Sequence, residues 1–237
     1  LLARDFNAMA DRIKALVDTR EQLLHNIAHE LRSPLARLRL AAELARRKDE
    51  RQDVQFDRIE RECERLDALV GNTLRLARLG AQPEPSDTLD LAAVVSAVVD
   101  DARYEAGEQQ VRIIWDSPPP VLVTGDRDGL ASAIENVLRN ALRFAPAHSA
   151  IRVRLSIGVR EACLEIEDRG PGVPATDLEA LFEPFFRTAS GSKAPGSGAG
   201  LGLSIAQAAI AAHKGRISAR NVSPQGLSVR MELPLLA

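Results

Sequence analysis

Residues 56–77 read FDRIERECERLDALVGNTLRLA, and the spacing of apolar side chains in this stretch decides the fold of the N-terminal part of the chain. Apolar or small residues recur at alternating intervals of three and four: Phe56, Ile59, Cys63, Leu66, Val70, Thr73 and Ala77. Such spacing is typical of helices that pack along one seam in bundles and coiled coils. It predicts a long helix with a buried seam, in which Cys63 is a small core residue rather than a ligand or a reactive thiol.

A second amphipathic helix precedes this one. With about 100° per residue, the apolar residues of 23–40 gather in one sector of the helix: Leu24, Ile27, Leu31, Leu35 and Leu38. The polar run RRKDER at residues 46–51 separates the two helices, so residues 21–80 predict a helical hairpin. Because one hairpin buries little apolar surface, we expect two copies to pair as a dimeric four-helix bundle.

The composition changes after this hairpin. Of 15 Gly and 13 Pro, only Gly71, Gly80 and Pro34 occur in the first 82 residues. Residues 81–88 carry two prolines and predict a linker, and residues 89–237 alternate helical and strand patterns. The helical patterns cover 89–106, 128–144 and 200–213, and the strand patterns cover 111–115, 151–157, 162–167, 216–220 and 227–233. We expect an α/β sandwich, in which helices cover one face of a sheet.

Charge and composition exclude several classes of partner. The chain has 31 Lys and Arg against 33 Asp and Glu, a net charge of -2, and 3% aromatic residues. This balance argues against nucleic-acid binding and against an anionic membrane surface. Two cysteines can form neither a disulfide framework nor a four-ligand zinc site. With no apolar run of roughly 18 residues and no signal peptide, we expect this stretch to be a soluble, cytoplasmic polypeptide.

His29 is the first candidate for chemistry. It lies about 160° from the centre of the apolar sector, on the solvent face of its helix, and Ser33 lies about as far round the other way. A proline at position 34 breaks a local rule in this helix, and such breaks often mark function. A neutral imidazole has one unprotonated nitrogen that can attack phosphorus, and Glu30 can hold the proton on the other nitrogen. Alone, an exposed His-Glu pair is usually an ordinary surface feature; the other histidines, His25, His148 and His213, have no such context.

A glycine-rich run, GAGLGL at residues 198–203, leads directly into a helical pattern. Backbone amides in such a loop can hold phosphates, helped by the helix N-terminus. No Lys-Ser/Thr pair follows, as a Walker A loop requires, and Leu203 stands where the dinucleotide fingerprint needs glycine. The run is therefore either a phosphate-binding loop of another type or a flexible loop.

Two further features would complete a nucleotide site. Asp168 opens the run DRGPG at the end of a strand pattern. It lies an even number of residues after the strand's inward-facing Leu164 and Ile166, so its carboxylate is expected to point inward too. Burying a carboxylate costs free energy unless the group is paired. A carboxylate accepts hydrogen bonds and suits the exocyclic amine of adenine; the alternative is a turn aspartate before glycine. Asn136 and Asn140 share one exposed face of the helix 128–144, which Arg143 and Phe144 extend, and amide oxygens are suitable Mg²⁺ ligands.

Together these motifs resemble those of two-component sensor histidine kinases, in the order found in that family. HELRSPL at 29–35 resembles the H box, NVLRNA at 136–141 the N box, DRGPG at 168–172 the first glycine box, FEPFFR at 182–187 the F box, and GAGLGL at 198–203 the second glycine box. Each motif is weak by itself, but five in order cover about residues 20–237. Residues 1–20 resemble the end of a HAMP signalling helix.

The resemblance implies a dimerisation and phosphotransfer domain at 21–80, a linker at 81–88, and a catalytic domain at 89–237 of the type shared with gyrase and chaperone ATPases. His29 would accept the γ-phosphoryl group of ATP with Glu30 as its base, and Asn140, with Asn136, would hold Mg²⁺. Asp168 would read adenine, while Arg143 and Lys193 would neutralise phosphate charge. The implied ATP-binding set is Asn136, Asn140, Arg143, Phe144, Asp168, Gly170, Gly172, Lys193, Gly198, Gly200, Leu201 and Gly202.

The resemblance also implies partners. The phosphoryl group would pass to an aspartate in the receiver domain of a response regulator, and a membrane sensor upstream would place the full-length protein in the bacterial inner membrane. Ser33 stands where the family usually has Thr or Asn. Its hydroxyl could hold a water for dephosphorylation of the regulator, or it is simply a solvated serine. A protein with dominant phosphatase output and an ATP-sensing scaffold are the alternatives; intact His29, Glu30, Asn140 and Asp168 count against the scaffold.

Overall fold

The computed structural model describes residues 27, 31, 33–45, 52–79, 87–116, 118–188 and 199–236. The chain divides into two compact units, with the division inside the long helix α2 (Gln52–Leu79), between Thr73 and Leu74. His29, Glu30, Lys193, Gly198, most of the predicted linker and the HAMP-like residues 1–20 lie outside the described residues.

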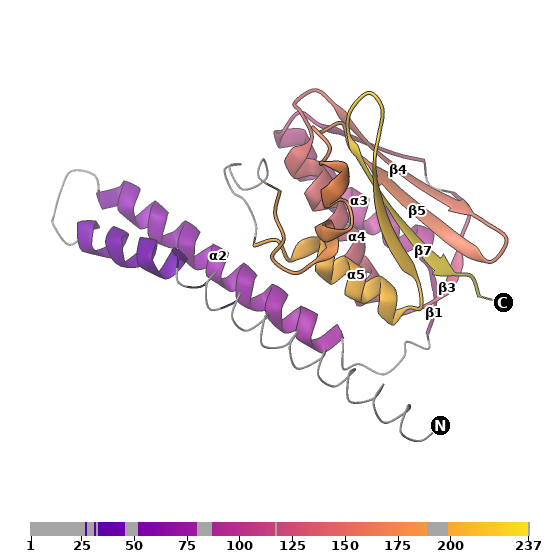
Figure 1. The fold of residues 1–237 in the computed structure, drawn as a ribbon, viewed down its shortest axis with the longest axis horizontal. Coiled ribbons are helices and arrows are strands. Elements are labelled where there is room, and N and C mark those ends of the chain that lie inside the picture. The colour runs from indigo at the N-terminus through magenta and orange to yellow at the C-terminus, as the bar shows by residue number, and fades with distance from the viewer. Residues whose placement is uncertain are drawn as a thin grey trace, which may run out of the picture. The chain divides into compact units, whose positions relative to one another are not determined.

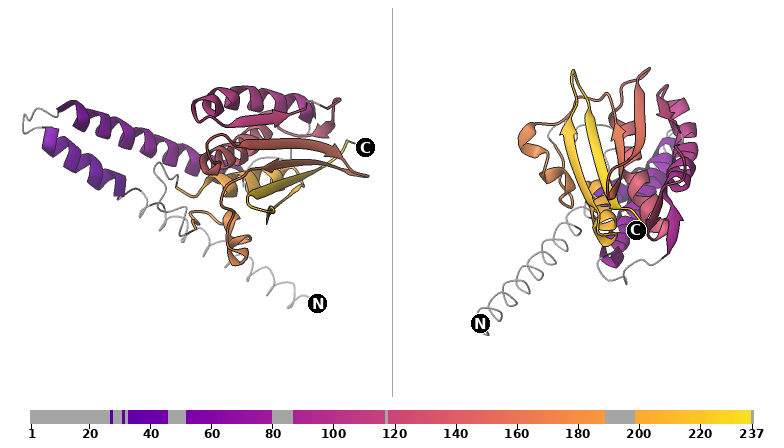
Figure 2. Two further views of the ribbon diagram at one scale, coloured as in Figure 1. Left: turned by 90° about the horizontal axis from the view of Figure 1, so that it is seen from above. Right: turned by 90° about the vertical axis from the view of Figure 1, so that its right-hand side faces the viewer.

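The first unit contains a helical hairpin, as predicted. Residues 33–45 are helical and lie beside α2 in both views (Figures 1 and 2). The side chains buried between the two helices are small on the first helix, where Pro34, Ala41 and Ala45 are buried, and include Leu69 on α2. Ser33 is exposed, as the helical wheel predicts.

The prediction of a buried Cys63 is wrong for the single chain, because Cys63 is exposed. Phe56 and Val70, each seven residues from Cys63, are also exposed, at 56% and 47%. The physical reason is geometric: the hairpin buries the side of α2 that carries Glu62 and Leu69, and this side is about 110° from the row of Phe56, Cys63 and Val70 at about 100° per residue. One hairpin cannot cover both faces of the same helix.

The second unit is built on a five-stranded sheet in the order β2-β4-β5-β7-β6. β2 pairs with β4 in parallel and the other neighbours pair antiparallel. The bounds of these strands are β2 Arg112–Trp115, β4 Ala150–Ile157, β5 Glu161–Glu167, β6 Arg216–Asn221 and β7 Leu227–Pro234. A separate antiparallel pair is formed by β1 (Thr88–Asp90) and β3 (Leu122–Thr124). Sequence patterns predict the five longer strands but not this pair, because three residues are too short to show alternation.

Three helices cover one face of the sheet (Figures 1 and 2): α3 (Leu91–Glu108), α4 (Arg127–Phe144) and α5 (Gly202–Ala212). Two short 3₁₀ turns, Ala175–Asp177 and Ala180–Phe182, precede α5. The core joins alternate residues of the strands, such as Leu164 and Ile166, to helical residues such as Leu138. The predicted α/β sandwich is confirmed; Thr88, predicted as the end of the linker, already belongs to β1.

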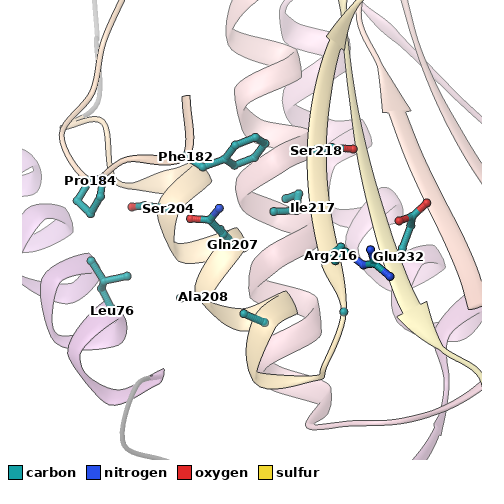
Figure 3. Close-up of a pocket in the computed structure, with 12 residues that line it drawn as sticks. Leu76, Phe182, Pro184, Ser204, Gln207, Ala208, Arg216, Ile217, Ser218 and Glu232 are labelled. Carbon is teal, nitrogen blue, oxygen red and sulfur yellow. The ribbon is translucent and has the colours of Figure 1, made fainter. Parts of the chain in front are cut away.

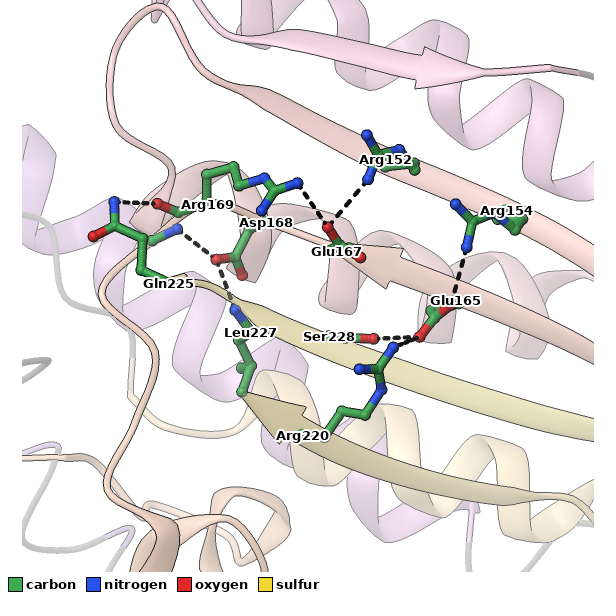
Figure 4. A network of polar contacts seen from close by, with 11 residues as sticks. Arg152, Arg154, Glu165, Glu167, Asp168, Arg169, Arg220, Gln225, Leu227 and Ser228 are labelled. Atoms are coloured by element: carbon green, nitrogen blue, oxygen red, sulfur yellow. Dashed lines mark hydrogen bonds and ion pairs between the residues drawn. The ribbon is translucent and has the colours of Figure 1, made fainter. Parts of the chain in front are cut away.

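The other face of the sheet carries charged side chains (Figure 4). Glu165 on β5 accepts from Arg220 and from the Ser228 hydroxyl, each at 2.7 Å, and Arg154 lies 3.6 Å away. Partial burial opposes ionisation of Glu165, but the hydrogen bonds from Ser228 and Arg220 outweigh it and hold the pKa of this carboxyl below its usual value. Arginines from the flanking strands thus tie β5 to β4 on one side and, across β7, to β6 on the other. No helix among the described residues is long and apolar enough to cross a membrane.

Candidate functional site

Asp168 lies at the end of β5 with 4% of its surface exposed. Its Oδ1 accepts hydrogen bonds from the backbone N–H of Gly170 at 2.7 Å and of Leu227 at 3.2 Å (Figure 4). Burial raises the pKa of Asp168, although the two backbone hydrogen bonds partly oppose this. Because both bonds fall on one oxygen, Oδ2 is left to accept from a ligand.

The glycines after Asp168 allow a close approach to the end of α4. A Cβ on Gly170 would lie 2.8 Å from the carbonyl oxygen of Phe144, so only glycine lets these two backbones meet. Gly172 has a φ of +69°, and a Cβ there would lie 2.7 Å from Asn221 Oδ1. The first glycine run and the end of the asparagine-bearing helix, distant in sequence, are therefore adjacent in the fold.

The two asparagines of α4 differ in what their side chains can still bind. Asn136 donates from Nδ2 to the Ser132 carbonyl at 2.8 Å, and its Oδ1 faces Gly202, 3.0 Å from the position of a Cβ. Asn140 is half-buried and has no hydrogen-bond partner in the part of the chain that the structure describes. Asn140 is therefore the better cation ligand of the two, while the amide of Asn136 is held by Ser132 within α4, with its Oδ1 beside Gly202.

Arg143, one turn beyond Asn140, makes no ion pair within the part of the chain that the structure describes. Its Nε and Nη2 are buried and have no hydrogen-bond partner among the described residues, and its guanidinium lies 5.3 Å from the centroid of the Phe144 ring. Burial, and then the nearby charge of Arg187, lower the pKa of Arg143. A partly buried cation next to a second cation is costly, and an anionic ligand would lower that cost.

Sequence reasoning places Arg187 in the F box but leaves it out of the site. Its charge acts on Arg143 across 44 positions of sequence. The only sequence signal is its place at the end of FEPFFR, and neither periodicity nor charge count shows which way that segment faces.

Around the second glycine run, two backbones are in direct contact. Gly200 has a φ of +75°, and a Cβ there would lie 2.8 Å from backbone atoms of both Phe185 and Phe186. Phe185 itself has a φ of +67° and donates from its N–H to the Gly200 carbonyl at 2.9 Å. Leu201 is buried, and Gly202 opens α5, whose first turn has no side-chain cap. The amides at this helix start are available for phosphate oxygens.

Two histidines outside these motifs have ordinary surroundings. His213 is buried, donates from Nδ1 to the Ala209 carbonyl at 2.7 Å, and accepts at Nε2 from the Asp126 N–H at 2.9 Å. This pair of bonds requires a neutral ring and joins the end of α5 to the start of α4. His148 is exposed in a turn with a φ of +62°.

Figure 3 shows a pocket outside this set of residues. Ser204, Gln207 and Ala208 of α5 line it together with residues 215–218 around the start of β6. None of the predicted nucleotide-binding residues within the described part of the chain lines this pocket. It is therefore not the site built by Asp168, Asn140 and Arg143.

Two families match this chain. Residues 19–82 match the His Kinase A (phospho-acceptor) domain, and residues 125–237 match the histidine kinase-, DNA gyrase B-, and HSP90-like ATPases. The sensor histidine kinase CpxA of Escherichia coli (strain K12) is 34% identical over 232 residues, which cover 97% of this chain and 50% of CpxA. The chain spans about half the length of the curated relatives it matches.

Solved structures agree with these matches. The mycobacterial sensor histidine kinase MprB superposes with a TM-score of 0.54 at 30% identity, over 63% of this chain and 97% of that one. The Acinetobacter baumannii histidine kinase AdeS gives a TM-score of 0.70 over 88% of this chain and 98% of that one. At 24% identity the likeness to AdeS concerns the fold alone.

Proposed function

This chain belongs to the sensor histidine kinase family, and from that premise we propose that it phosphorylates His29 from ATP and passes the phosphoryl group to an aspartate of a response regulator. One observation carries the proposal beyond the family. Nε and Nη2 of Arg143 are buried and have no hydrogen-bond partner among the described residues; Arg143 lies one turn from Asn140, on the helix that meets the Asp168 loop at Phe144. A nucleotide supplies an anion for Arg143 and an exocyclic amine for Asp168 Oδ2.

The donor set also fits Mg²⁺. Among the described residues no cluster of three or more His, Cys, Asp or Glu could hold a metal ion, and the ion would have to be held by few protein atoms. Mg²⁺ is commonly bound in this way, by one or two protein oxygens together with waters and phosphate oxygens. We assign Asn140 Oδ1 to it, with Asn136 as a weaker candidate because its amide is engaged with Ser132. Bound there, Mg²⁺ would neutralise charge on the phosphates.

In the kinase step, an unprotonated ring nitrogen of His29 forms a bond to the γ-phosphorus. The bond from this phosphorus to its bridging oxygen breaks, and the electron pair leaves with ADP. Glu30 accepts a hydrogen bond from the other ring nitrogen and stabilises the positive charge that develops on the ring. Arg143, with Lys193, neutralises phosphate charge. In the transfer step the N–P bond breaks and an aspartate oxygen of the receiver domain bonds to phosphorus.

We further propose that the chain acts as a homodimer, and that the whole protein is held in a bacterial inner membrane through its sensor region. The dimer is supported by the exposed apolar row of Phe56 and Val70, because such a row on a bundle helix needs a partner. A second activity, dephosphorylation of the regulator, is supported by Ser33, whose exposed side chain is held by Arg37 on the same helix.

The test of the kinase proposal is incubation with γ-labelled ATP and Mg²⁺. We expect an acid-labile label in the chain, and none in the variant His29→Ala, because the only proposed acceptor nitrogen is gone. ATP binding should stay within about two-fold, since substitutions away from a binding site usually change little. Replacement of His25, also in the N-terminal helical sequence, is the matched control and should leave labelling intact. Undiminished labelling of His29→Ala would overturn the proposal.

A further inference from the structure

Ser33, Arg37 and Glu62 form a chain of hydrogen bonds inside the helical hairpin. Arg37 Nε and Nη2 each donate to one carboxylate oxygen of Glu62 at 2.9 Å, and Nη1 donates to the Ser33 hydroxyl at 2.6 Å. Glu62 belongs to α2, 25 positions away from Arg37. One guanidinium therefore bridges the two helices and holds the serine side chain at the same time.

This arrangement differs from an ordinary surface ion pair. The Glu62 side chain is 10% exposed, against 49% for Arg37, and both carboxylate oxygens are used. A paired, two-point contact of arginine with a buried carboxylate has a fixed geometry, whereas isolated exposed pairs contribute little. Since Arg37 is fixed by Glu62, the third donor, Nη1, fixes the position of the Ser33 oxygen.

The contact constrains what the Ser33 hydroxyl can do. A hydroxyl has one donor hydrogen and two acceptor lone pairs, and Arg37 occupies one of the lone pairs. The second lone pair can accept a hydrogen from a water, which turns the lone pair of that water toward a phosphorus docked beside it. In the hydrolysis that follows, the water oxygen bonds to phosphorus, and the bond from phosphorus to the aspartate oxygen breaks. The electron pair goes to the aspartate carboxylate, and the water proton goes to the released phosphate.

We propose that Arg37 and Glu62 are positioning residues for Ser33 in dephosphorylation of the response regulator, an inference that rests on the proposed phosphatase activity. Neither residue touches the reacting atoms: Arg37 orients the Ser33 hydroxyl, and Glu62 orients Arg37. Because Glu62 lies on α2 and Ser33 on the preceding helix, the orientation of the hydroxyl depends on how the two helices pair.

The experiment follows loss of label from a receiver domain that this chain has itself phosphorylated, after ATP is removed. Ser33→Ala should lower the hydrolysis rate by about ten-fold or more, the loss expected for one hydrogen bond in the reacting complex. Arg37→Gln and Glu62→Gln should lower the maximal rate by a similar factor. The regulator concentration that gives half the maximal rate should stay within about two-fold of that of the unmodified chain. Arg39→Gln, an exposed arginine two positions away, is the matched control and should keep the rate of the unmodified chain.

Combining the substitutions separates positioning from structure. If Arg37 acts through Ser33, then Arg37→Gln and Glu62→Gln cause no further loss in a Ser33→Ala background, since coupled residues are not additive. Ser33→Thr keeps the hydroxyl and should stay sensitive to Arg37→Gln. Glu62→Gln preserves the size of the side chain and so provides a variant that folds, as its melting temperature will check.

The outcomes distinguish the inference from its premise. A chain that does not dephosphorylate the receiver domain, or a Ser33→Ala variant with an unchanged rate, would overturn the proposed phosphatase role and the inference with it. Loss of activity in Ser33→Ala with unchanged rates in Arg37→Gln and Glu62→Gln would overturn the inference alone. Further losses of equal size in the Ser33→Ala background would also overturn it, because they would assign Arg37 and Glu62 a structural role.

Discussion

At the scale of single residues, the carboxylate of Asp168 combines a structural and a recognition role on two different oxygens. Oδ1 accepts from the backbone N–H groups of Gly170 and Leu227, so an asparagine side chain could keep these two bonds with its own oxygen. The opposite atom would then change from the acceptor Oδ2 to an amide N–H₂ donor. A donor at this position opposes the exocyclic amine of adenine.

We therefore expect Asp168→Asn to weaken ATP binding by a factor in the tens, because a charge-assisted hydrogen bond of about 1.5–3 kcal/mol is lost. Titration calorimetry measures this, with Asp101→Asn on the exposed side of α3 as control. Unchanged affinity would make Asp168 a turn residue only.

The same substitution, Asp168→Asn, should not lower the stability of the fold, although it weakens ATP binding. The pKa of Asp168 is raised in the folded chain by burial, so its ionised form disfavours folding once the pH exceeds that pKa. At pH 7 the melting temperature of Asp168→Asn should equal or exceed that of the unmodified chain, and any gain should shrink as the pH falls toward 4. A variant that melts several degrees lower at pH 7 would contradict this.

At the scale of secondary-structure elements, the charged face of the sheet depends on Glu165 in the central strand β5. Its pKa is held below the usual value by Ser228 and Arg220 despite partial burial. A lowered folded pKa means that this carboxylate stabilises the fold above its unfolded pKa, and that the contribution is lost as the pH falls through the folded pKa. The contribution is thus fully present at neutral pH.

Glu165→Gln should lower the free energy of unfolding at pH 7 by about 1–2 kcal/mol, since hydrogen bonds to a charged acceptor are lost. Urea unfolding at a series of pH values measures this free energy. The difference in unfolding free energy between Glu165→Gln and the unmodified chain should become smaller below about pH 4. Glu161→Gln is the control, because Glu161 lies 3.8 Å from Arg216 and the Arg216 side chain is 81% exposed, so this ion pair should contribute little. A difference in unfolding free energy that stays constant from pH 7 to pH 3 would show that the charge of Glu165 is not the cause of the difference.

At the scale of the whole molecule, α2 carries two faces with different tasks. One face, with Glu62 and Leu69, is buried inside the hairpin. The other, with Phe56, Cys63 and Val70, stays exposed in the single chain. An apolar row at intervals of seven residues is the pattern by which bundle helices pair, and a second copy of the chain is the partner that we propose for it.

A charge placed in this row should separate the dimer. Val70→Glu is expected to shift the mass measured by light scattering at about 10 μM from two chains to one, because pairing would bury an uncompensated carboxylate. Ala68→Glu adds the same charge on an exposed position about 160° away around α2 and should leave the dimer intact. A Val70→Glu variant that keeps the mass of two chains would show that this row is not the interface.

Sequence by itself determined the class of the fold and the identity of most candidate residues. Periods of 3.5 residues at 56–77 and of two residues at 151–157 reflect side-chain directions that local backbone geometry imposes, so helices and strands could be located within a few residues. The order of five short motifs was enough to indicate the family, because each motif is local. The three-residue strands β1 and β3 were not predicted, because they form only through pairing with each other, such as Thr88 with Thr124.

Only the tertiary structure decided how these residues act, because the deciding contacts join positions far apart in the chain. The contact of Asp168 with Leu227 spans 59 positions, and it determines which carboxylate oxygen is left for a ligand. The burial of Arg143 Nε and Nη2 without a hydrogen-bond partner in the described part of the chain and the exposure of Cys63 depend on packing, which periodicity does not reveal. The same holds for Arg37, whose bonds to Glu62 on α2 exist only once the two helices pair. Local spacing specifies the direction of a side chain, and packing specifies what that side chain meets.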